Sequence, residues 1–253
     1  MGTMPTALIT GASAGLGREF AWQLAESGHG LVLVARGTDR LETLAAQLRA
    51  AAHVEVEVMT ADLAHPSDVE RVAERVRDGE RPVDLLVNNA GYGLGGSFLR
   101  TSAREEVDAL TAMVGAVLVL SRAACDAMVP RGHGAIVNVG SVAGVMTSGT
   151  YSAHKAWVRV FTEGLARTLA RTGVTATVVN PGLTRTEFHE RAGWKASGAP
   201  AFAWLSADRV VADTLAAVAA GKAEVTPSLR YRLASLGLRL APRSLVRRVS
   251  RRF

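Results

Sequence analysis

The chain has 253 residues, of which 48% are hydrophobic and 21% are charged, and its formal net charge is +6. This composition excludes an intrinsically disordered chain, while the length allows one or two domains. Cys125 is the single cysteine, which excludes an intrachain disulfide and a cysteine-rich metal site, and we find no secretory signal or membrane-length apolar run, so we expect a cytoplasmic protein.

Short β-branched segments alternate with longer amphipathic segments along the chain, a pattern typical of βαβ units and a parallel sheet. The predicted strands are Thr6–Thr10, Gly30–Ala35, Val54–Thr60, Val83–Asn88, Gly134–Gly140, Val174–Asn180 and the short Ala223–Thr226. The predicted helices are Leu16–Ser27, Asp39–Ala51, Pro66–Gly79, Ala103–Val129, Tyr151–Thr172 and Ala207–Ala220. We therefore expect an α/β fold with a Rossmann-type, doubly wound parallel sheet of about seven strands flanked by helices.

The alternation continues without a Pro/Gly/Ser linker or a fixed-period repeat, which predicts one main domain at residues 1–227. A basic amphipathic C-terminal extension follows at residues 228–253. Residues 182–206 interrupt the pattern with aromatic side chains among glycines, prolines and charges. Long irregular segments are usually functional, so we interpret this one as a loop that covers a substrate; the alternative is a packed surface loop.

A glycine-rich loop follows the first predicted strand and opens the first predicted helix. Its glycines, Gly11, Gly15 and Gly17, allow a tight turn and let backbone N–H groups approach a pyrophosphate at the positive end of the helix. Three residues separate the first two glycines, unlike the Gly-x-Gly-x-x-Gly spacing, so a plain turn is the alternative. The residues predicted to bind a dinucleotide here are Gly11, Ser13, Ala14, Gly15, Leu16 and Gly17.

The ends of the next two predicted strands indicate which dinucleotide binds. Arg36 follows the second strand, where an acidic residue would bind the ribose 2′-hydroxyl of NAD and an arginine can pair with the 2′-phosphate of NADP. Asp62 and Leu63, after the third strand, are expected to meet the adenine ring. The predicted cofactor is therefore NADP(H), and residues 1–227 are the predicted dinucleotide-binding and catalytic domain.

Asn88-Asn89-Ala90-Gly91 follows the fourth predicted strand. Ligands of open α/β sheets bind at the carboxyl ends of the strands, so we expect Asn89, Ala90 and Gly91 to contact the cofactor. A turn or helix-capping role for the asparagines is the alternative.

Ser141, Tyr151 and Lys155 form the predicted reactive group. Ser141 follows the fifth strand, and Tyr151 and Lys155 are four residues apart near the start of a helix, so they share one face. A neighbouring ammonium favours the phenolate of a tyrosine, whose ordinary pKa near 10 is too high for a base at neutral pH. His154 points about 100° away from Lys155 on the same helix, and we expect it to have no catalytic role. No His/Cys/Asp/Glu cluster predicts a metal site.

Taken together, these segments resemble the short-chain dehydrogenase/reductase family from about Thr6 to Thr186. The matching motifs are the Thr10–Gly17 loop, Asn88–Gly91, and Tyr-x-x-x-Lys at Tyr151-Ser152-Ala153-His154-Lys155. The resemblance implies that Tyr151 moves a proton to or from the substrate oxygen and that Ser141 hydrogen-bonds that oxygen. It also implies that Tyr151 and Lys155 bind the cofactor, with Lys155 holding the nicotinamide ribose. It further implies that Pro181, Gly182, Thr184 and Thr186 contact the nicotinamide end and that the protein is a dimer or tetramer of identical chains.

Two positions depart from the family pattern. Met113 stands where the family carries an asparagine that helps order a water in a proton relay, and a thioether cannot donate a hydrogen bond. The ten-residue step from Ser141 to Tyr151 is shorter than usual, and a tightened 144–149 loop is expected to absorb it.

The extension concentrates the positive charge of the chain. Residues 228–253 contain eight arginines and no acidic residue, a charge of +8, which leaves −2 on the rest. The main domain therefore offers no basic surface for nucleic acid, and we expect no nucleic-acid partner. Leucines recur here at helical spacing, which leaves two alternatives. The extension makes weak contact with a membrane surface, so that a cytoplasmic protein is peripheral to the membrane, or it forms a terminal helix packed on the domain or on a sister subunit.

The sequence thus predicts an NADP(H)-dependent oxidoreductase that transfers hydride between nicotinamide and a ketone or secondary alcohol. The aromatic 182–206 loop suggests an apolar or aromatic substrate. Two alternatives remain at this point: a redox-neutral epimerase or eliminase with a retained cofactor, suggested by Met113, and a non-catalytic dinucleotide-binding regulator.

Overall fold

A computed structural model describes residues 4–95, 97–188 and 200–250. Seven strands form one sheet in the order β3-β2-β1-β4-β5-β6-β7, and every neighbouring pair is parallel. The strands are β1 Thr6–Thr10, β2 Gly30–Ala35, β3 Val56–Thr60, β4 Leu85–Asn88, β5 Gly134–Val139, β6 Val174–Val179 and β7 Glu224–Val225. The Rossmann-type fold with a doubly wound sheet is confirmed, because β1 and β4 are neighbours and the chain winds outward from them in both directions.

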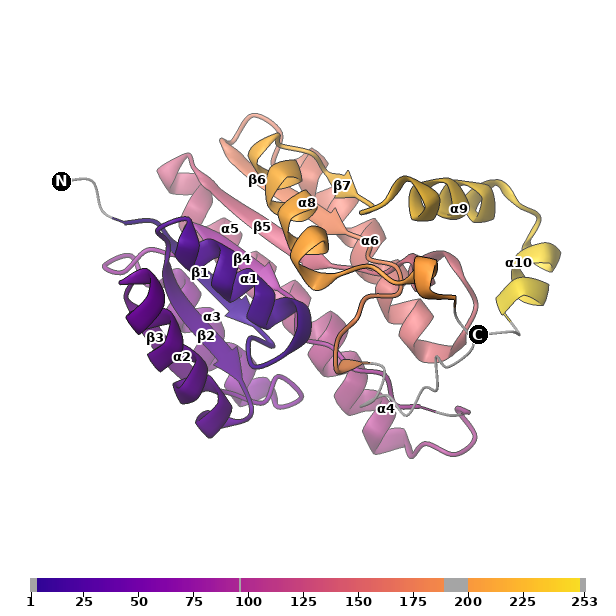
Figure 1. The fold of residues 1–253 in the computed structure, drawn as a ribbon, viewed down its shortest axis with the longest axis horizontal. Helices are drawn as coiled ribbons and strands as arrows, with labels where there is room; N and C mark the ends of the chain where they lie inside the picture. The colour runs from indigo at the N-terminus through magenta and orange to yellow at the C-terminus, as the bar shows by residue number, and fades with distance from the viewer. Residues whose placement is uncertain (1–3, 96, 189–199, 251–253) are drawn as a thin grey trace.

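Helices cover both faces of the sheet (Figure 1). They are α1 Gly15–Glu26, α2 Thr38–Ala52, α3 Pro66–Arg77, α4 Ala103–Leu110, α5 Ala116–Arg131, α6 Gly149–Thr168 and α8 Ala207–Ala219. Successive strand residues point to opposite faces: Ile9 packs with α1, α2 and α8, whereas its neighbour Leu8 packs with α3 and α5. Burial on both sides explains why the central strands read as continuous apolar runs.

The helix that sequence periodicity predicts as one piece, 103–129, has an internal defect. A π-helical turn at Thr111–Gly115 separates α4 from α5. By length and composition, the helical stretch Ala103–Arg131 is long and apolar enough to cross a membrane. The apolar runs of the sequence, which are shorter, did not suggest this. Half of the most apolar window of this stretch is buried inside the protein. Its inner residues pack against the sheet and α3, as those of a core helix do.

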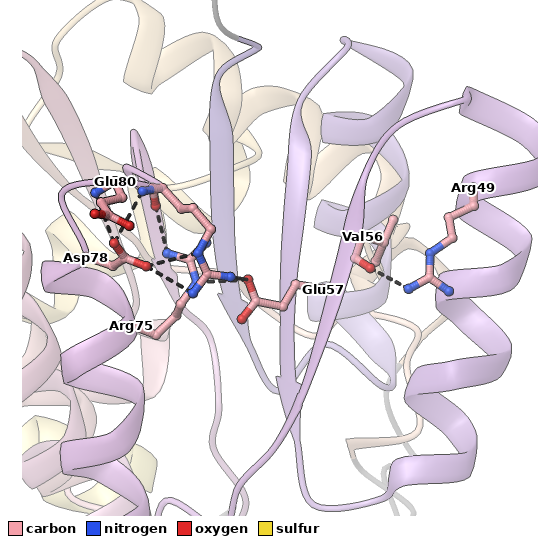
Figure 2. Close-up of polar contacts among 7 residues, drawn as sticks. Arg49, Val56, Glu57, Arg75, Asp78 and Glu80 are labelled. Atoms are coloured by element: carbon pink, nitrogen blue, oxygen red, sulfur yellow. Dashed lines mark hydrogen bonds and ion pairs between the residues drawn. The ribbon is translucent and has the colours of Figure 1, made fainter.

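The edge strand β3 is fastened to its neighbouring helices by arginines (Figure 2). Arg75 on α3 is buried and pairs through Nε with Glu57 Oε2 on β3 at 2.8 Å, while its Nη1 donates to the carbonyl of Arg81 at 2.8 Å. From the other side, Arg49 on α2 donates to the carbonyl of Val56. These contacts cover part of the edge, which would otherwise offer unpaired strand groups to another chain.

The chain ends in two helices beyond β7, α9 Leu229–Leu240 and α10 Arg243–Ser250. They lie at the β6–β7 side of the molecule, away from α2 and β3 (Figure 1). The boundary at residue 227 between a main domain and an extension stays a prediction.

Candidate active site at the carboxyl ends of the strands

The loop between β1 and α1 has a shape that requires glycine. Gly11 and Gly15 have φ of +66° and +54°, in the left-handed region that other residues seldom occupy. A Cβ at Gly17 would overlap the carbonyl oxygen of Gly11 and lie 2.5 Å from Asn89 Nδ2. The turn is therefore tight and free of side chains on its inner side, as a loop that admits a diphosphate must be.

The start of α1 is open to an anion. Among the described residues no side chain caps the N-terminus of α1 at Ala14, and its first turn contains no acidic residue. The backbone N–H groups and the positive end of the helix dipole are thus available to a phosphate. Ser13 and Leu16 are half-buried in this same loop, and Thr186 packs against Gly15, where a Cβ would lie 3.3 Å from Thr186 Cβ. The loop fits a dinucleotide's pyrophosphate.

Asn89 holds this loop from the end of β4. Its Nδ2 donates to the carbonyl of Thr10 at 2.9 Å and to that of Gly11 at 3.3 Å. In return, Thr10 Oγ1 accepts the backbone N–H groups of Asn89 and Ala90, both at 3.0 Å. The two strand ends at the point where the sheet changes winding direction are locked together, so Asn89 shapes the loop as well as lining it.

Arg36 lies at the end of β2 with an exposed side chain. Its guanidinium carbon is 5.9 Å from the centre of the Tyr92 ring, an aromatic partner that was not predicted from the sequence. After β3, Leu63 is buried, and Asp62 Oδ1 accepts the N–H of Ala64 at 3.1 Å. Arg36 thus presents a held positive charge at the position predicted to meet the adenosine end of the cofactor.

Tyr151 and Ser141 meet despite their short separation in sequence. A 3₁₀ turn, Val142–Val145, follows Ser141, and α6 begins at Gly149, two residues before Tyr151 and earlier than predicted. Gly149 has φ of +71°, which lets the chain reverse sharply into the helix. The Ser141 side chain lies close enough to Tyr151 to lower the pKa of its hydroxyl. The predicted tightening of the 144–149 loop therefore accounts for the ten-residue step.

Lys155 approaches the same place from the next turn of α6. Its side chain is buried, with 4% exposed, and Nζ donates to the carbonyl of Val139 at the end of β5 at 2.7 Å. The same Nζ is 5.8 Å from the centre of the Tyr151 ring. The structure brings Ser141, Tyr151 and Lys155 together.

Burial sets the protonation of this group. Burial raises the pKa of Tyr151 to about 12, against a smaller lowering by the hydrogen bond from Ser141. Burial also lowers the pKa of Lys155 to about 8. Tyr151 therefore carries its proton at neutral pH, as a general acid must, and Lys155 titrates within the range where enzymes are usually assayed.

Met113 lies next to this group, inside the π-helical turn. A Cβ at Gly91 would lie 3.4 Å from Lys155 Nζ and 3.5 Å from Met113 Sδ, so the thioether and the ammonium flank the same glycine. The buried methionine thus occupies the space beside Lys155 without offering a hydrogen-bond donor.

A buried amide network beneath the site was not foreseen from the sequence. Asn88 Nδ2 donates to Asn138 Oδ1 at 2.9 Å and to Ser121 Oγ at 3.3 Å. Asn138 Nδ2 donates in turn to Thr162 Oγ1 on α6 at 2.9 Å. This network ties β4 and β5 to the helix that carries Tyr151 and Lys155. The signal was present, since both asparagines end apolar strands, yet their pairing depends on strand order.

The described part of the 182–206 loop, with Pro181 before it, lies beside Tyr151 and the turn that follows Ser141. Pro181 accepts the N–H of Val142 at 3.0 Å, and Thr184 Oγ1 donates to the carbonyl of Gly182 at 3.0 Å. The ring of Phe188 is 5.6 Å from that of Tyr151, centre to centre. An aromatic side chain thus borders the reactive tyrosine. Trp194, another aromatic residue of the predicted loop, lies outside the described residues.

His154 is not part of this reactive group. His154 is buried, and burial lowers its pKa. Within residues 4–95, 97–188 and 200–250, no group of three or more His, Cys, Asp or Glu side chains is placed to hold a metal ion.

Known proteins are similar to this chain in sequence and in fold. A family model described as short chain dehydrogenase matches residues 5–195. The chain is 34% identical over 184 residues to the 3-oxoacyl-[acyl-carrier-protein] reductase FabG of Escherichia coli (strain K12), covering 72% of this chain and 74% of that protein. A short-chain dehydrogenase from Sphingobium yanoikuyae in complex with NADPH matches with a TM-score of 0.85 and 36% identity over 92% of each chain. A bulky-bulky ketone specific alcohol dehydrogenase from Comamonas testosteroni matches with a TM-score of 0.81 and 30% identity over 96% of each chain.

Proposed function

Because this chain is an oxidoreductase and belongs to the short-chain dehydrogenase/reductase family, we propose that it is an NADP(H)-dependent carbonyl reductase or alcohol dehydrogenase. The proposed substrate is a ketone, or the corresponding secondary alcohol, with apolar or aromatic substituents. The observation that carries the proposal is the placement of Ser141, Tyr151 and the Lys155 ammonium together, at the strand ends next to the glycine loop.

The chain's own groups have distinct roles in the proposed reaction. Bound NADPH supplies the hydride that the carbonyl carbon receives. Tyr151 donates its hydroxyl proton to the carbonyl oxygen, and Ser141 hydrogen-bonds that oxygen and orients it. Lys155, held by Val139, places a positive charge near the phenolate that Tyr151 becomes. The pKa of Tyr151, about 12, keeps its hydroxyl protonated at neutral pH, which is the state that a proton donor to a ketone requires.

Three features support the cofactor and substrate classes. Arg36 supplies a charge for a 2′-phosphate, and the similar Sphingobium yanoikuyae structure is a complex with NADPH. Phe188 borders Tyr151 and favours an apolar group beside the reacting carbon. The similar Comamonas testosteroni protein is specific for bulky-bulky ketones.

The first test is consumption of NADPH, compared with NADH, across a panel of ketones, aldehydes and quinones. The proposal expects oxidation of NADPH in preference to NADH with at least one apolar ketone. Met113 beside Lys155 favours a second candidate, a redox-neutral epimerisation or elimination with retained cofactor. Product formed without net NADPH consumption would support that candidate, whereas NADPH binding without any conversion would support a non-catalytic regulator.

Replacing Arg36 with Ser tests the cofactor preference. Loss of a charge-assisted hydrogen bond to a phosphate costs about 1.5–3 kcal/mol, so the KM for NADPH should rise by roughly 10- to 150-fold. The KM for NADH, which has no 2′-phosphate, should change by less than about threefold. Arg40→Ser, which removes another exposed arginine four residues away, serves as the control. An equal rise for both cofactors would contradict selection of the 2′-phosphate by Arg36.

The lowered pKa of Lys155 predicts a pH profile for ketone reduction. The ammonium is present below pH about 8 and is lost above it, so kcat/KM should be flat at lower pH and fall through about pH 8. Tyr151 alone would produce a loss only near its own pKa of about 12. Rates measured with saturating NADPH from about pH 6 to about pH 10 check this, with enzyme returned to about pH 7 as the stability control. A kcat/KM that stays constant across this whole pH range would show that activity does not depend on the protonation of Lys155.

The assembly and location are part of the proposal. The neighbouring helices α5 and α6 expose Leu118, Val129 and Val160, an apolar surface that a second copy of the chain would cover. A dimer or tetramer is therefore proposed, and sedimentation velocity checks it. The single cysteine, Cys125, is half-buried and unpaired, which suits the proposed cytoplasmic location.

A further inference from the structure

The C-terminal extension directs a row of leucines toward solvent. Residues spaced by four, three and four along α9 fall on one helix face. The members of this leucine face, with their exposed fractions, are Leu229 at 61%, Leu233 at 59%, Leu236 at 52% and Leu240 at 79%. The terminal helix does pack on its own domain, one of the alternatives open from the sequence, but it does so through other residues and leaves these leucines exposed.

The opposite face of α9 fixes this orientation. Tyr231 packs over Gly182, and its hydroxyl accepts the N–H of Leu183 at 3.1 Å and donates to the carbonyl of Ala203 at 2.7 Å. Ser235, one turn later on the same side, is buried. The leucine face cannot turn inward without breaking these contacts, so its exposure is built into the fold.

The second helix of the extension is docked in the same way. Val246 is buried, and Ser250 Oγ accepts the N–H of Thr147 at 2.9 Å. Leu245 remains 48% exposed on the outer side of α10. The two helices thus hold fixed positions against the loops on either side of Tyr151.

Positive charge surrounds the exposed apolar side chains. Arg232 is exposed beside the leucine face, and Arg230 places its guanidinium 5.6 Å from the ring centre of Phe202, which is itself 67% exposed. Arg239 pairs with Glu224 on β7. The extension as a whole has eight arginines and no acidic residue.

We propose that the leucine face of α9, with the surrounding arginines, docks on an anionic membrane surface. The leucines would enter the outer acyl region, and the arginines would meet the lipid phosphates. A second copy of the chain is less suited to cover this face. A two-fold contact would bring two clusters of arginine together, and the extension has no acidic residue to pair with them. Docking through α9 would place Leu183 and Ala203, which Tyr231 holds, near the lipid surface.

Co-sedimentation of the full chain with lipid vesicles tests the proposal. Vesicles of phosphatidylcholine alone are compared with vesicles containing about 30% phosphatidylglycerol, at low and high salt. The wild-type chain should bind the anionic vesicles at least about tenfold more tightly than the neutral ones, and high salt should weaken that binding. A Leu233→Ser/Leu236→Ser double variant should bind about tenfold more weakly, since insertion depends on buried apolar area.

Leu99→Ser is the matched control, because Leu99 is 92% exposed but lies outside the extension, and it should bind like the wild type. Circular dichroism melts establish that all variants are folded. Wild-type protein that stays in the supernatant with anionic vesicles would overturn the proposal, as would equal binding by the double variant. A dimer that dissociates in the double variant, without vesicle binding by the wild type, would instead assign the leucine face to a second copy.

Discussion

The Tyr151→Phe variant is expected to reduce a ketone with NADPH at about one thousandth of the wild-type turnover number, the scale on which general acids contribute to rate. The change removes one hydroxyl and leaves the ring against Phe188, so the fold should be preserved. With the proton donor gone, Ser141 and Lys155 remain in place but cannot replace it: the serine hydroxyl is a far weaker acid, and Lys155 donates to the Val139 carbonyl.

Two readouts make the tyrosine result specific. NADPH binding, followed by cofactor fluorescence, should stay within about twofold of the wild type, because the phenol acts on substrate oxygen and not on the pyrophosphate. Tyr92→Phe removes a tyrosine hydroxyl elsewhere while keeping the ring beneath Arg36, and it should retain activity. Full turnover in Tyr151→Phe would refute the assignment of the proton donor.

The Gly17→Ala variant should lose both stability and cofactor binding. Its added methyl group would overlap the carbonyl oxygen of Gly11 and press on Asn89, so the loop that those residues hold must move. Overpacking of this kind costs about 1–3 kcal/mol, which for a chain of this size lowers the melting temperature by roughly 2–12 °C. The dissociation constant for NADPH should rise by at least about tenfold, because the backbone N–H groups lose their alignment. Calorimetry and fluorescence titration measure the two effects.

Gly164→Ala provides the opposite control within the same chain. Gly164 is an exposed residue of α6, and a methyl group added there would have no heavy atom of another residue within 4 Å, outside its chain neighbours and the adjoining helix backbone. Alanine at this helical position should raise the free energy of unfolding by about 0.4–1 kcal/mol. If the Gly17→Ala variant were as stable as the wild type and bound NADPH as tightly, the close approach of Gly17 to the Gly11 carbonyl would be contradicted.

Most of the fold was predictable because its local patterns agree with its tertiary structure. Burial on both faces made the strands continuous apolar runs, and β1 and β2 begin and end at the predicted residues. The π-helical turn at Thr111–Gly115 was missed because it covers only five residues, too few for apolar spacing to distinguish it from the α-helix on either side. It alters the hydrogen-bond pattern, which periodicity does not report.

The site was predictable where its residues are close in sequence, as in the glycine loop and the Tyr151/Lys155 pair. The contact of Tyr92 with Arg36 and the contact of Tyr231 with Leu183 were not, because each joins segments that only strand order brings together. The outward orientation of the leucine face was equally hidden. Helical spacing identifies an apolar face, but the contacts of Tyr231 and Ser235 decide which way it points.

The buried amide network also governs how accurately the sheet can assemble. Asn88 and Asn138 are direct partners in the pairing of β4 with β5. A shift of one residue between these strands would place Asn88 opposite Val137 or Val139, in an interior where a polar group without a partner costs about 1–3 kcal/mol. Apolar strands alone would tolerate such a slip more readily. The two asparagines therefore favour one register at the centre of the sheet, and a sheet with these strands misaligned would be less stable.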